Sequence, residues 1–307
     1  MKPGSGEPDA AAIVARAGEE LERLLQRPLA PGLHVVATPI GNLGDVTLRA
    51  LAALARADVL YCEDTRHSRT LLSHYRISRP ARAYHEHSAA REREQILAEL
   101  GAGKSVALIS DAGTPLVSDP GYKLVRAVLD AGHTVSVLPG ASAALAALGV
   151  AGLATDTFLF AGFLPAKRGA RRSRLAELRA VPATLIFFEA PSRVAASLED
   201  MAEVFAGREV AVARELTKLH ESVVRGSAAK LAKWAEASAP KGEFVVLVGP
   251  PAPPAATDED IAAALEPLLS SMSLAEAARR VAETLAVPKA RVYDIGLMLK
   301  GRMDTST

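Results

Sequence analysis

The sequence contains a single cysteine, Cys62, and few aromatic residues: 7 Phe, 5 Tyr and 1 Trp among 307 residues. One cysteine excludes an internal disulfide framework and a zinc site built from several thiolates, and it suits a reducing compartment such as the cytoplasm. Because aromatic side chains are scarce, the core must be built mainly from Ala, Leu and Val. Hydrophobic residues still make up 49% of the chain, which argues against bulk disorder.

A net charge of either sign is also lacking, since 36 Lys and Arg face 35 Asp and Glu. The chain as a whole is therefore not a polycation, and a nucleic-acid site would have to be a local patch. The longest uncharged stretch, 134–155, is interrupted by Pro139 and Gly140. We interpret it as a strand, a tight turn and an Ala-rich helix, and we expect no membrane partner.

The first half of the chain has the pattern of an α/β domain. We expect residues 1–30 to form a mobile N-terminal extension with one amphipathic helix at 10–26. Over 31–152, apolar runs alternate with helical stretches near 46–56, 89–100 and 119–131; the runs lie at 33–37, 57–61, 105–109 and 134–138. Because these runs lack clean alternation, they predict strands that are buried on both faces of a parallel sheet.

A second α/β domain is expected over 153–250. Its strands are predicted at 158–163, 184–189, 209–215, 222–226 and 243–249. Some of them follow each other closely, so this sheet is predicted to be mixed. Residues 251–307 begin as a Pro-rich linker and continue as a helical hairpin, with helices near 274–286 and 289–300. Thr257 with Asp260 and Ser273 with Glu276 have the spacing of capping boxes.

Four polar loops follow predicted strands of the first domain, at 38–44, 63–66, 110–121 and 139–142. Ligands of α/β proteins bind at the carboxyl ends of strands, so these loops are the expected binding site. The longest loop, SDAGTPLVSDPG, combines two acidic residues with hydroxyl side chains and with four Pro or Gly residues. No Gly-x-Gly-x-x-Gly motif follows a strand, which disfavours a Rossmann dinucleotide site and the commonest methyltransferase fold.

The ordered motifs resemble those of the tetrapyrrole methylase superfamily of S-adenosylmethionine (SAM) methyltransferases. They span about 33–249 and read TPIGNLGD, EDTRHSRTLL, SDAGTPLVSDPG, PGASA, GFLPAKRGARRSRL, FFEAPSR, ARELTKLHE and KGEFVVLVG. Within that superfamily they are most similar to the members that methylate the ribose 2′-hydroxyl of a decoding-centre cytidine in 16S ribosomal RNA. Eight motifs in order are far more specific than any one of them.

The resemblance implies two α/β domains with SAM bound in the cleft between them, a small C-terminal helical hairpin, and a homodimer. The residues that it assigns to SAM are Pro39, Asp111, Gly113, Thr114, Ser118, Ser142, Glu189, Leu216, Thr217, Glu243 and Phe244. Members that modify tetrapyrroles usually have Gly-Asp-Pro where this chain has Gly113-Thr114-Pro115. That departure counts against a porphyrin-like substrate.

Methyl transfer to a ribose hydroxyl needs a hydrogen-bond acceptor or base, because this hydroxyl is a poor acid at neutral pH. The candidates are Glu63 and Asp64, with Arg66 as the partner of a phosphate or carboxylate. Glu189 and His85 remain alternatives, and the sequence does not decide among them. SAM supplies the reactive group, so the interpretation requires no metal.

A basic segment supports an RNA substrate independently of the resemblance. Residues 161–176 contain five cations and no acid: Lys167, Arg168, Arg171, Arg172 and Arg174. Such groups match RNA phosphates, so we expect contact with small-subunit ribosomal RNA here. Two alternatives remain open. One is a methylase of the same fold acting on a tetrapyrrole or another small molecule, and the other is a non-catalytic nucleic-acid-binding protein that uses the C-terminal hairpin.

Overall fold

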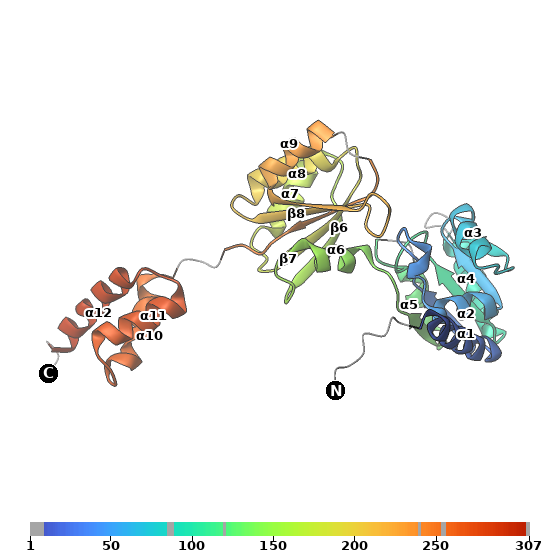
Figure 1. Ribbon diagram of the computed structural model, residues 1–307, viewed down its shortest axis with the longest axis horizontal. Helices are drawn as coiled ribbons and strands as arrows, with labels where there is room; N and C mark the ends of the chain where they lie inside the picture. The colour runs from blue at the N-terminus through green and yellow to red at the C-terminus, as the bar shows by residue number, and fades with distance from the viewer. Residues whose placement is uncertain (1–8, 85–88, 119–120, 239–240, 253–255, 305–307) are drawn as a thin grey trace. The chain divides into compact units, whose positions relative to one another are not determined.

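The computed structural model describes residues 9–84, 89–118, 121–238, 241–252 and 256–304. The chain forms two compact units, 1–251 and 252–307 (Figure 1). The first unit holds two five-stranded sheets, which define its first and second lobes. Within the described residues, no helix is both long and apolar enough to cross a bilayer.

The sheet of the first lobe is entirely parallel and has the strand order β3-β2-β4-β1-β5. Its strands are β1 (Gly32–Val36), β2 (Val59–Cys62), β3 (Ala81–Ala83), β4 (Ser105–Ile109) and β5 (Val135–Leu138). The central strands β1, β2 and β4 are buried throughout, as the unbroken apolar runs predict. Strand β3 was not predicted, because only three residues form it and none of them is buried.

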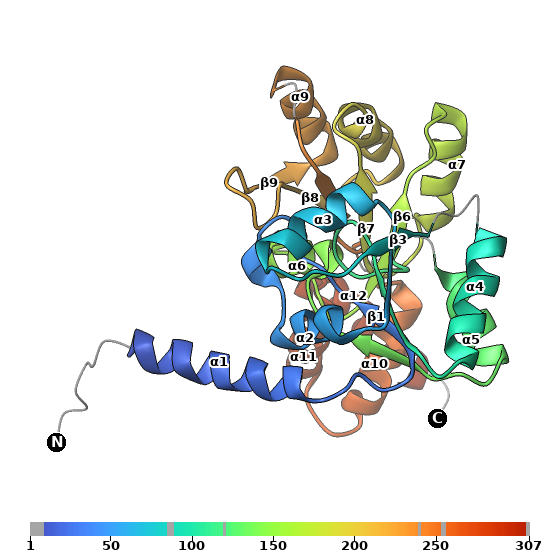
Figure 2. The ribbon, with the colours of Figure 1, turned by 90° about the vertical axis from the view of Figure 1, so that its right-hand side faces the viewer.

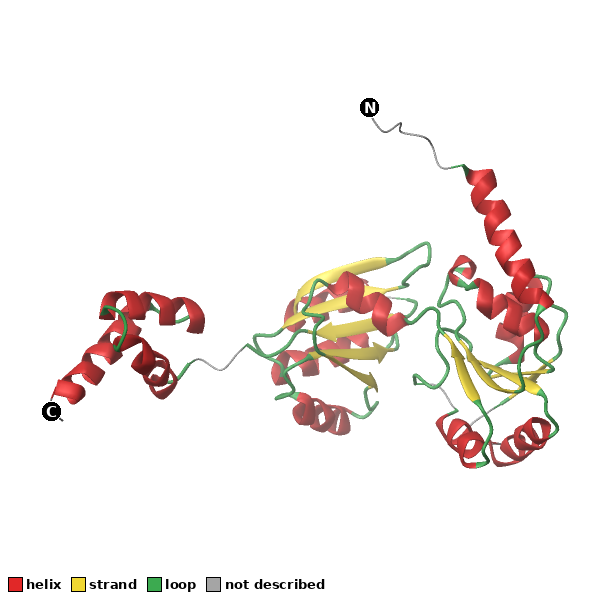
Figure 3. Ribbon diagram, turned by 90° about the horizontal axis from the view of Figure 1, so that it is seen from below, coloured by secondary structure: helices red, strands yellow, loops and turns green. Residues whose placement is uncertain are grey.

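Helices cover both faces of this first sheet (Figure 3). They are α2 (Leu48–Arg56), α3 (Thr65–His74), α4 (Ala89–Gly101) and α5 (Tyr122–Asp130). Strand residues alternate between the faces: Leu60 packs with the leucines of α2 and α3, whereas Tyr61 packs with those of α4 and α5. This burial on both faces explains why the strands carry no polar alternation.

The second lobe contains the predicted mixed sheet, in the order β6-β7-β10-β8-β9. Its strands are β6 (Phe158–Phe163), β7 (Thr184–Glu189), β8 (Glu209–Arg214), β9 (Ser222–Ser227) and β10 (Phe244–Val248). Only the β6–β7 pair is parallel, while β7, β10, β8 and β9 pair antiparallel. One face carries α7 (Arg168–Leu178), α8 (Val194–Val204) and α9 (Ala228–Ser238), and the other carries α6 (Ala143–Ala151).

The loop after β1 joins the two lobes. Ile40 in this loop is buried among residues of α6 and the second sheet, including Ile186 and Leu247. Gly41 lies against the aliphatic chain of Lys218, at a place where a Cβ would overlap that side chain. This close approach brings the carboxyl ends of the first sheet next to the second lobe.

The predicted N-terminal helix is present as α1 (Ala10–Gln26), and it contacts α2 (Figure 2). The second unit contains α10 (Asp258–Leu269), α11 (Leu274–Leu285) and α12 (Lys289–Asp304). Thr257 and Asp260 form the predicted reciprocal capping box of α10. Ser273 accepts a hydrogen bond from the Glu276 backbone, which caps α11. The predicted hairpin thus corresponds to α11 and α12, with α10 packed against both.

Candidate functional site

Backbone and side-chain hydrogen bonds tie together the four polar loops that the sequence singled out. Thr38 and Gly113 exchange two backbone bonds of 2.8 and 3.0 Å, which join the loop after β1 to the loop after β4. Thr114 Oγ1 donates to the Ala141 carbonyl at 3.2 Å, and the Asp64 N–H donates to Asp111 Oδ1 at 2.9 Å. The loops therefore form one hydrogen-bonded platform at the carboxyl ends of the strands.

Strained backbone is concentrated beside this platform. Six described non-glycine residues have positive φ, and four of them are Leu116, Ser118, Glu215 and Thr217. Leu116 and Ser118 belong to the loop after β4, and the other two belong to the loop after β8. Such conformations cost about 1–3 kcal/mol each and occur most often at ligand sites. Their clustering makes the junction of the two lobes the candidate functional site.

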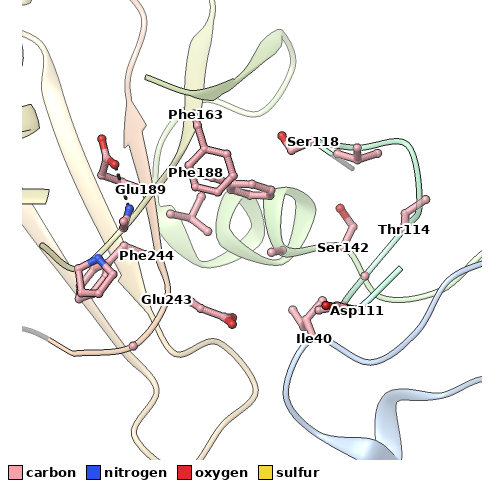
Figure 4. Close-up of a pocket in the computed structure, with 18 of the residues that line it drawn as sticks. Ile40, Asp111, Thr114, Ser118, Ser142, Phe163, Phe188, Glu189, Glu243 and Phe244 are labelled. Atoms are coloured by element: carbon pink, nitrogen blue, oxygen red, sulfur yellow. Dashed lines mark hydrogen bonds between the residues drawn. The ribbon is translucent and has the colours of Figure 1, made fainter. Parts of the chain in front are cut away.

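The larger cavity at this junction has a volume of about 490 Å³, within the usual range for small-molecule sites (Figure 4). In the close-up, the hydroxyls of Thr114, Ser118 and Ser142 lie on one side and the rings of Phe163 and Phe188 on the other. Four acids line the cavity: Glu63, Asp111, Glu189 and Glu243. Among the described residues, no Lys or Arg lines it, so its wall suits a ligand that carries positive charge.

A smaller cavity of about 390 Å³ lies next to the larger one. The two share Ile40, Asp111, Ala112 and Glu243, so they meet at these residues. Beyond this junction the smaller cavity is lined by the loop after β1, by His67, Ser68, Thr70 and Leu71 of α3, and by Lys218. The junction is therefore the place where a ligand in one cavity can react with a ligand in the other.

The structure brings most of the residues assigned to SAM into the larger cavity. Eight line it: Asp111, Gly113, Thr114, Ser118, Ser142, Glu189, Glu243 and Phe244. Pro39 lines the smaller cavity instead. Leu216 is packed in the core beside Ile40, and neither it nor Thr217 lines either cavity. Within the described part of the chain, the buried Thr217 Oγ1 has no hydrogen-bond partner, so it is a donor that a ligand or water would satisfy.

Glu189 is held in place by its neighbours. It is 3% exposed, and its carboxylate accepts hydrogen bonds from Ser197 Oγ at 2.5 Å and the Ala190 N–H at 2.9 Å. Arg193 Nε lies 3.1 Å from Oε1. These contacts already balance the charge of Glu189, so it orders the wall of the cavity.

Asp64 and Arg66 form an ion pair at the start of α3. The Arg66 guanidinium binds both carboxylate oxygens of Asp64, with Nη2–Oδ2 at 2.6 Å. The backbone N–H of Arg66 also donates to Oδ1 at 2.8 Å. These bonds hold the pKa of Asp64 well below its ordinary value. Asp64 therefore caps α3 and is a weak base. Glu63 lines the larger cavity, whereas His85 lies outside the described residues.

The five cations of the predicted RNA segment differ in their surroundings. Arg171 is 5% exposed, and its guanidinium binds Asp200 at 2.7 Å. Arg168 also binds Asp200, and Arg172 pairs with Glu203. Arg174 pairs with Glu177, and Lys167 is exposed at the helix start. Four of the five cations thus pair with acids. Three of these four pair with Asp200 or Glu203 of α8, and these ion pairs hold α7 against α8. That this segment contacts RNA stays a prediction.

A carboxylate–lysine cluster lies at the junction, on the side of the second lobe. Lys218 Nζ lies 3.0 Å from Glu215 Oε1 and 3.1 Å from Glu243 Oε2. Glu215 Oε1 also accepts the Glu243 N–H at 2.9 Å, and this bond, with Lys218, holds the pKa of Glu215 below its ordinary value. Sequence reasoning missed Lys218, His67, Phe163 and Phe188. All four lie inside motifs quoted for the resemblance, but no residue-level signal in the sequence separates them from core residues.

The family model for Tetrapyrrole (Corrin/Porphyrin) Methylases matches residues 32–232 of the chain. A protein of Mesorhizobium japonicum named Ribosomal RNA small subunit methyltransferase I is 53% identical over 91% of this chain and 95% of its own. Proteins of the same name from Erythrobacter litoralis and Pseudomonas aeruginosa are 50% and 45% identical. Those two matches cover 89% and 88% of this chain and 97% and 98% of theirs.

Solved structures share the fold at low identity. A cobalamin biosynthetic enzyme, cobalt precorrin-4 methyltransferase, aligns with a TM-score of 0.55 at 17% identity, over 71% of this chain and 94% of its own. The uroporphyrin-III C-methyltransferase of Thermus thermophilus, solved with S-adenosylhomocysteine, aligns with a TM-score of 0.50 at 20% identity. That match covers 70% of this chain and 96% of the other. Both alignments support the two-lobed architecture.

Proposed function

The chain belongs to the tetrapyrrole methylase family, and on that premise we propose that it is a SAM-dependent methyltransferase of small-subunit ribosomal RNA. We further propose that the methyl acceptor is the ribose 2′-hydroxyl of a cytidine. The observation that supports the cofactor most directly is the larger cavity, which combines aromatic and apolar walls, hydroxyls and carboxylates without Lys or Arg among its described lining residues. This wall suits a cofactor such as SAM, which joins an adenosyl group to a positively charged sulfur. It disfavours a nucleotide cofactor that carries phosphates.

The donor set of the cavity fits SAM part by part. The apolar walls of Phe163, Phe188 and Val245 suit a purine ring, and the hydroxyls of Ser118 and Ser142 suit hydroxyl and carboxylate groups. Asp111 suits the cationic groups. SAM supplies a methyl group on a positively charged sulfur, and the residues of this chain supply binding and orientation.

The support for RNA as the substrate comes from the relatives. They carry the name of a small-subunit ribosomal RNA methyltransferase at 45–53% identity, and this chain covers 95% or more of their length. Gly113-Thr114-Pro115 departs from the Gly-Asp-Pro of tetrapyrrole-modifying members, which also favours RNA over a porphyrin-like acceptor. An RNA-modifying role would place the protein in the cytoplasm with the ribosomal subunits.

We assign proton acceptance to Glu63 and a positioning role to the Asp64–Arg66 pair. Glu63 lines the larger cavity, whereas Asp64 lines neither cavity and its carboxylate binds Arg66 and caps the start of α3. In this role the Glu63 carboxylate would orient the ribose hydroxyl and accept its proton, while bound SAM would supply the methyl group.

The Glu63→Gln variant tests this assignment. We expect it to bind SAM with the wild-type dissociation constant in calorimetry and to lose about 10²–10⁴-fold in kcat. The Asp64→Asn variant is the matched control, and we expect it to keep most of kcat while its melting temperature falls, because it loses a cap and an ion pair. A Glu63→Gln variant with normal turnover, or an inactive but stable Asp64→Asn variant, would transfer the role to Asp64.

A homodimer is part of the proposal, and exposed apolar residues support it. Strands β5 and β6 are sheet edges, and on them Val137, Phe158 and Leu159 are 57%, 44% and 36% exposed. Leu145 of α6 is 56% exposed. A second copy of the chain would cover these side chains and protect both edges. Analytical ultracentrifugation should give twice the chain mass at micromolar protein, and Leu145→Glu should shift it toward the monomer. A wild-type monomer at 50 µM would contradict this part of the proposal.

A further inference from the structure

Helix α3 and the segment after it form a second basic region, which the prediction from sequence overlooked. Residues 65–84 contain five arginines and two histidines and no acid. Arg82 pairs with Glu99, and Arg79 Nε donates to the Ala55 carbonyl. The remaining arginines, Arg66, Arg69 and Arg76, are exposed. The number of Lys and Arg side chains equals that of the 161–176 segment, over a slightly longer stretch, but the groups around them differ.

The cations of α3 are less neutralised than those of α7. Arg66 has one acidic partner, Asp64, and its side chain is 85% exposed. In the described part of the chain, the side chains of Arg69 and Arg76 have neither a hydrogen-bond partner nor an acidic partner. On α7, by contrast, Arg168, Arg171, Arg172 and Arg174 all pair with acids. An RNA phosphate meets free positive charge on α3, whereas on α7 it must compete with carboxylates.

Helical spacing places Arg66 and Arg69 on one side of α3, and Arg76 lies two residues beyond the end of the helix. Arg66 and Arg69 are three residues apart, which on a helix puts their Cβ atoms about 5–6 Å from each other. Ser73 continues the same side, and Arg76 follows just beyond the end of α3. The adjacent side of the helix, through His67, Thr70 and Leu71, lines the smaller cavity. The positive charges of Arg66 and Arg69 therefore lie beside the smaller cavity, which adjoins the larger cavity proposed to bind SAM.

We propose that Arg66, Arg69 and Arg76 form an RNA-phosphate-binding row. It holds the backbone beside the target nucleotide while the ribose of that nucleotide enters the smaller cavity. This inference rests on the proposed function. The ribose reaches the junction at Asp111 and Glu243, where the larger cavity begins. An unstacked nucleotide is required for this entry, in agreement with the general preference of RNA-binding proteins for looped or single-stranded sites.

The double variant Arg69→Gln/Arg76→Gln tests the row, because neither residue has a structural partner to lose. The probe is purified small ribosomal subunit that lacks the modification, and the measurement is its dissociation constant at 50–300 mM KCl. We expect binding to weaken about tenfold at 150 mM KCl. The slope of log K against log salt should fall by about 1.4, since each single-strand phosphate contact contributes about 0.7. The dissociation constant for SAM should stay unchanged.

Lys230→Gln/Lys233→Gln on α9 is the matched control, because these two exposed lysines carry the same charge and α9 lines neither cavity. Arg172→Gln/Arg174→Gln on α7 tests the competing surface. The proposal requires the α3 variant to lose at least several-fold more affinity than either. Equal losses in all three variants, or a larger loss in the α7 variant, overturn it. The charge-preserving Arg69→Lys/Arg76→Lys variant should recover most of the affinity.

The outcomes separate this inference from the proposed function. Wild-type protein that binds the subunit through α3 but transfers no methyl group would refute the methyltransferase assignment and keep the row. Wild-type protein that methylates the subunit, with an α3 variant that binds as tightly as wild type, would keep the activity and refute the row. Wild-type protein without measurable affinity for the subunit would refute both.

Discussion

Replacing Arg171 by methionine distinguishes a structural role of α7 from an RNA-binding role. Asp200 is 1% exposed, and Arg171 supplies two nitrogens to it, with Nε–Oδ2 at 2.7 Å. Arg171→Met leaves Asp200 buried with Arg168 as its remaining partner, at 3.1 Å. Breaking a buried ion pair costs about 3–5 kcal/mol of folding free energy. Because the bond to Arg168 remains, we expect this variant to lose about 3 kcal/mol.

The assay for this variant is the fluorescence of Trp234, the only tryptophan in the sequence, which packs against the core formed by α7, α8 and α9. For a unit of this size, about 3 kcal/mol corresponds to a melting temperature lower by about 6–12 °C. The double variant Arg171→Met/Asp200→Leu should recover most of the loss, because it removes the buried charge as well. An unchanged melting temperature for Arg171→Met, together with weaker RNA binding, would refute the structural assignment.

Two further predictions follow from the packing around the site. The hydrogen bonds that lower the pKa of Glu215 stabilise the folded state above the ordinary glutamate value of 4.5, and this stabilisation disappears as the pH falls through the lower folded value. In urea unfolding at pH 7, Glu215→Gln should therefore be less stable than wild type by about 1.5 kcal/mol. This difference in stability should shrink below pH 4.5, and a difference that does not depend on pH would contradict the prediction. Gly140→Ala places a Cβ 2.9 Å from the Ala37 Cβ and should cost about 1–3 kcal/mol, whereas Gly149→Ala, which meets nothing within 4 Å inside α6, should stabilise by about 0.5–1 kcal/mol in thermal melts. Equal melting temperatures for these two variants would contradict the packing of the 139–142 loop on β1.

Strands β4 and β7 begin and end at the predicted residues, and both are almost completely buried, as their unbroken apolar runs indicated. Strand β6 also matches its predicted bounds, although it is an edge strand without a fully buried residue, because its run of apolar residues is bounded by polar sequence before it and by Pro165 after it. Helix α3 was missed as a helix because its only apolar residues are Leu71 and Leu72, while polar side chains fill the rest. Such a helix is stabilised by its tertiary contacts with the first sheet, and its sequence shows no helical periodicity of apolar residues from which it could be predicted.

The polar loops that line the two cavities could be predicted because polar residues directly after buried strands are informative by themselves. The partners of Arg171 could not be, because Asp200 lies 29 residues further along the chain and on another helix. A charge count over 161–176 also ends one residue before Glu177, the partner of Arg174. Local sequence thus indicates where cations are dense, and only the fold shows which of them remain available to a phosphate.

The most direct test of the central claim is methyl transfer from labelled SAM to small ribosomal subunits from a strain that lacks this gene, followed by nucleoside analysis of the RNA. We expect the label to be recovered as 2′-O-methylcytidine and large subunits to stay unlabelled. Label on a base would contradict the ribose assignment. The absence of transfer to RNA, with SAM bound in calorimetry, would contradict the RNA substrate and favour a small-molecule acceptor.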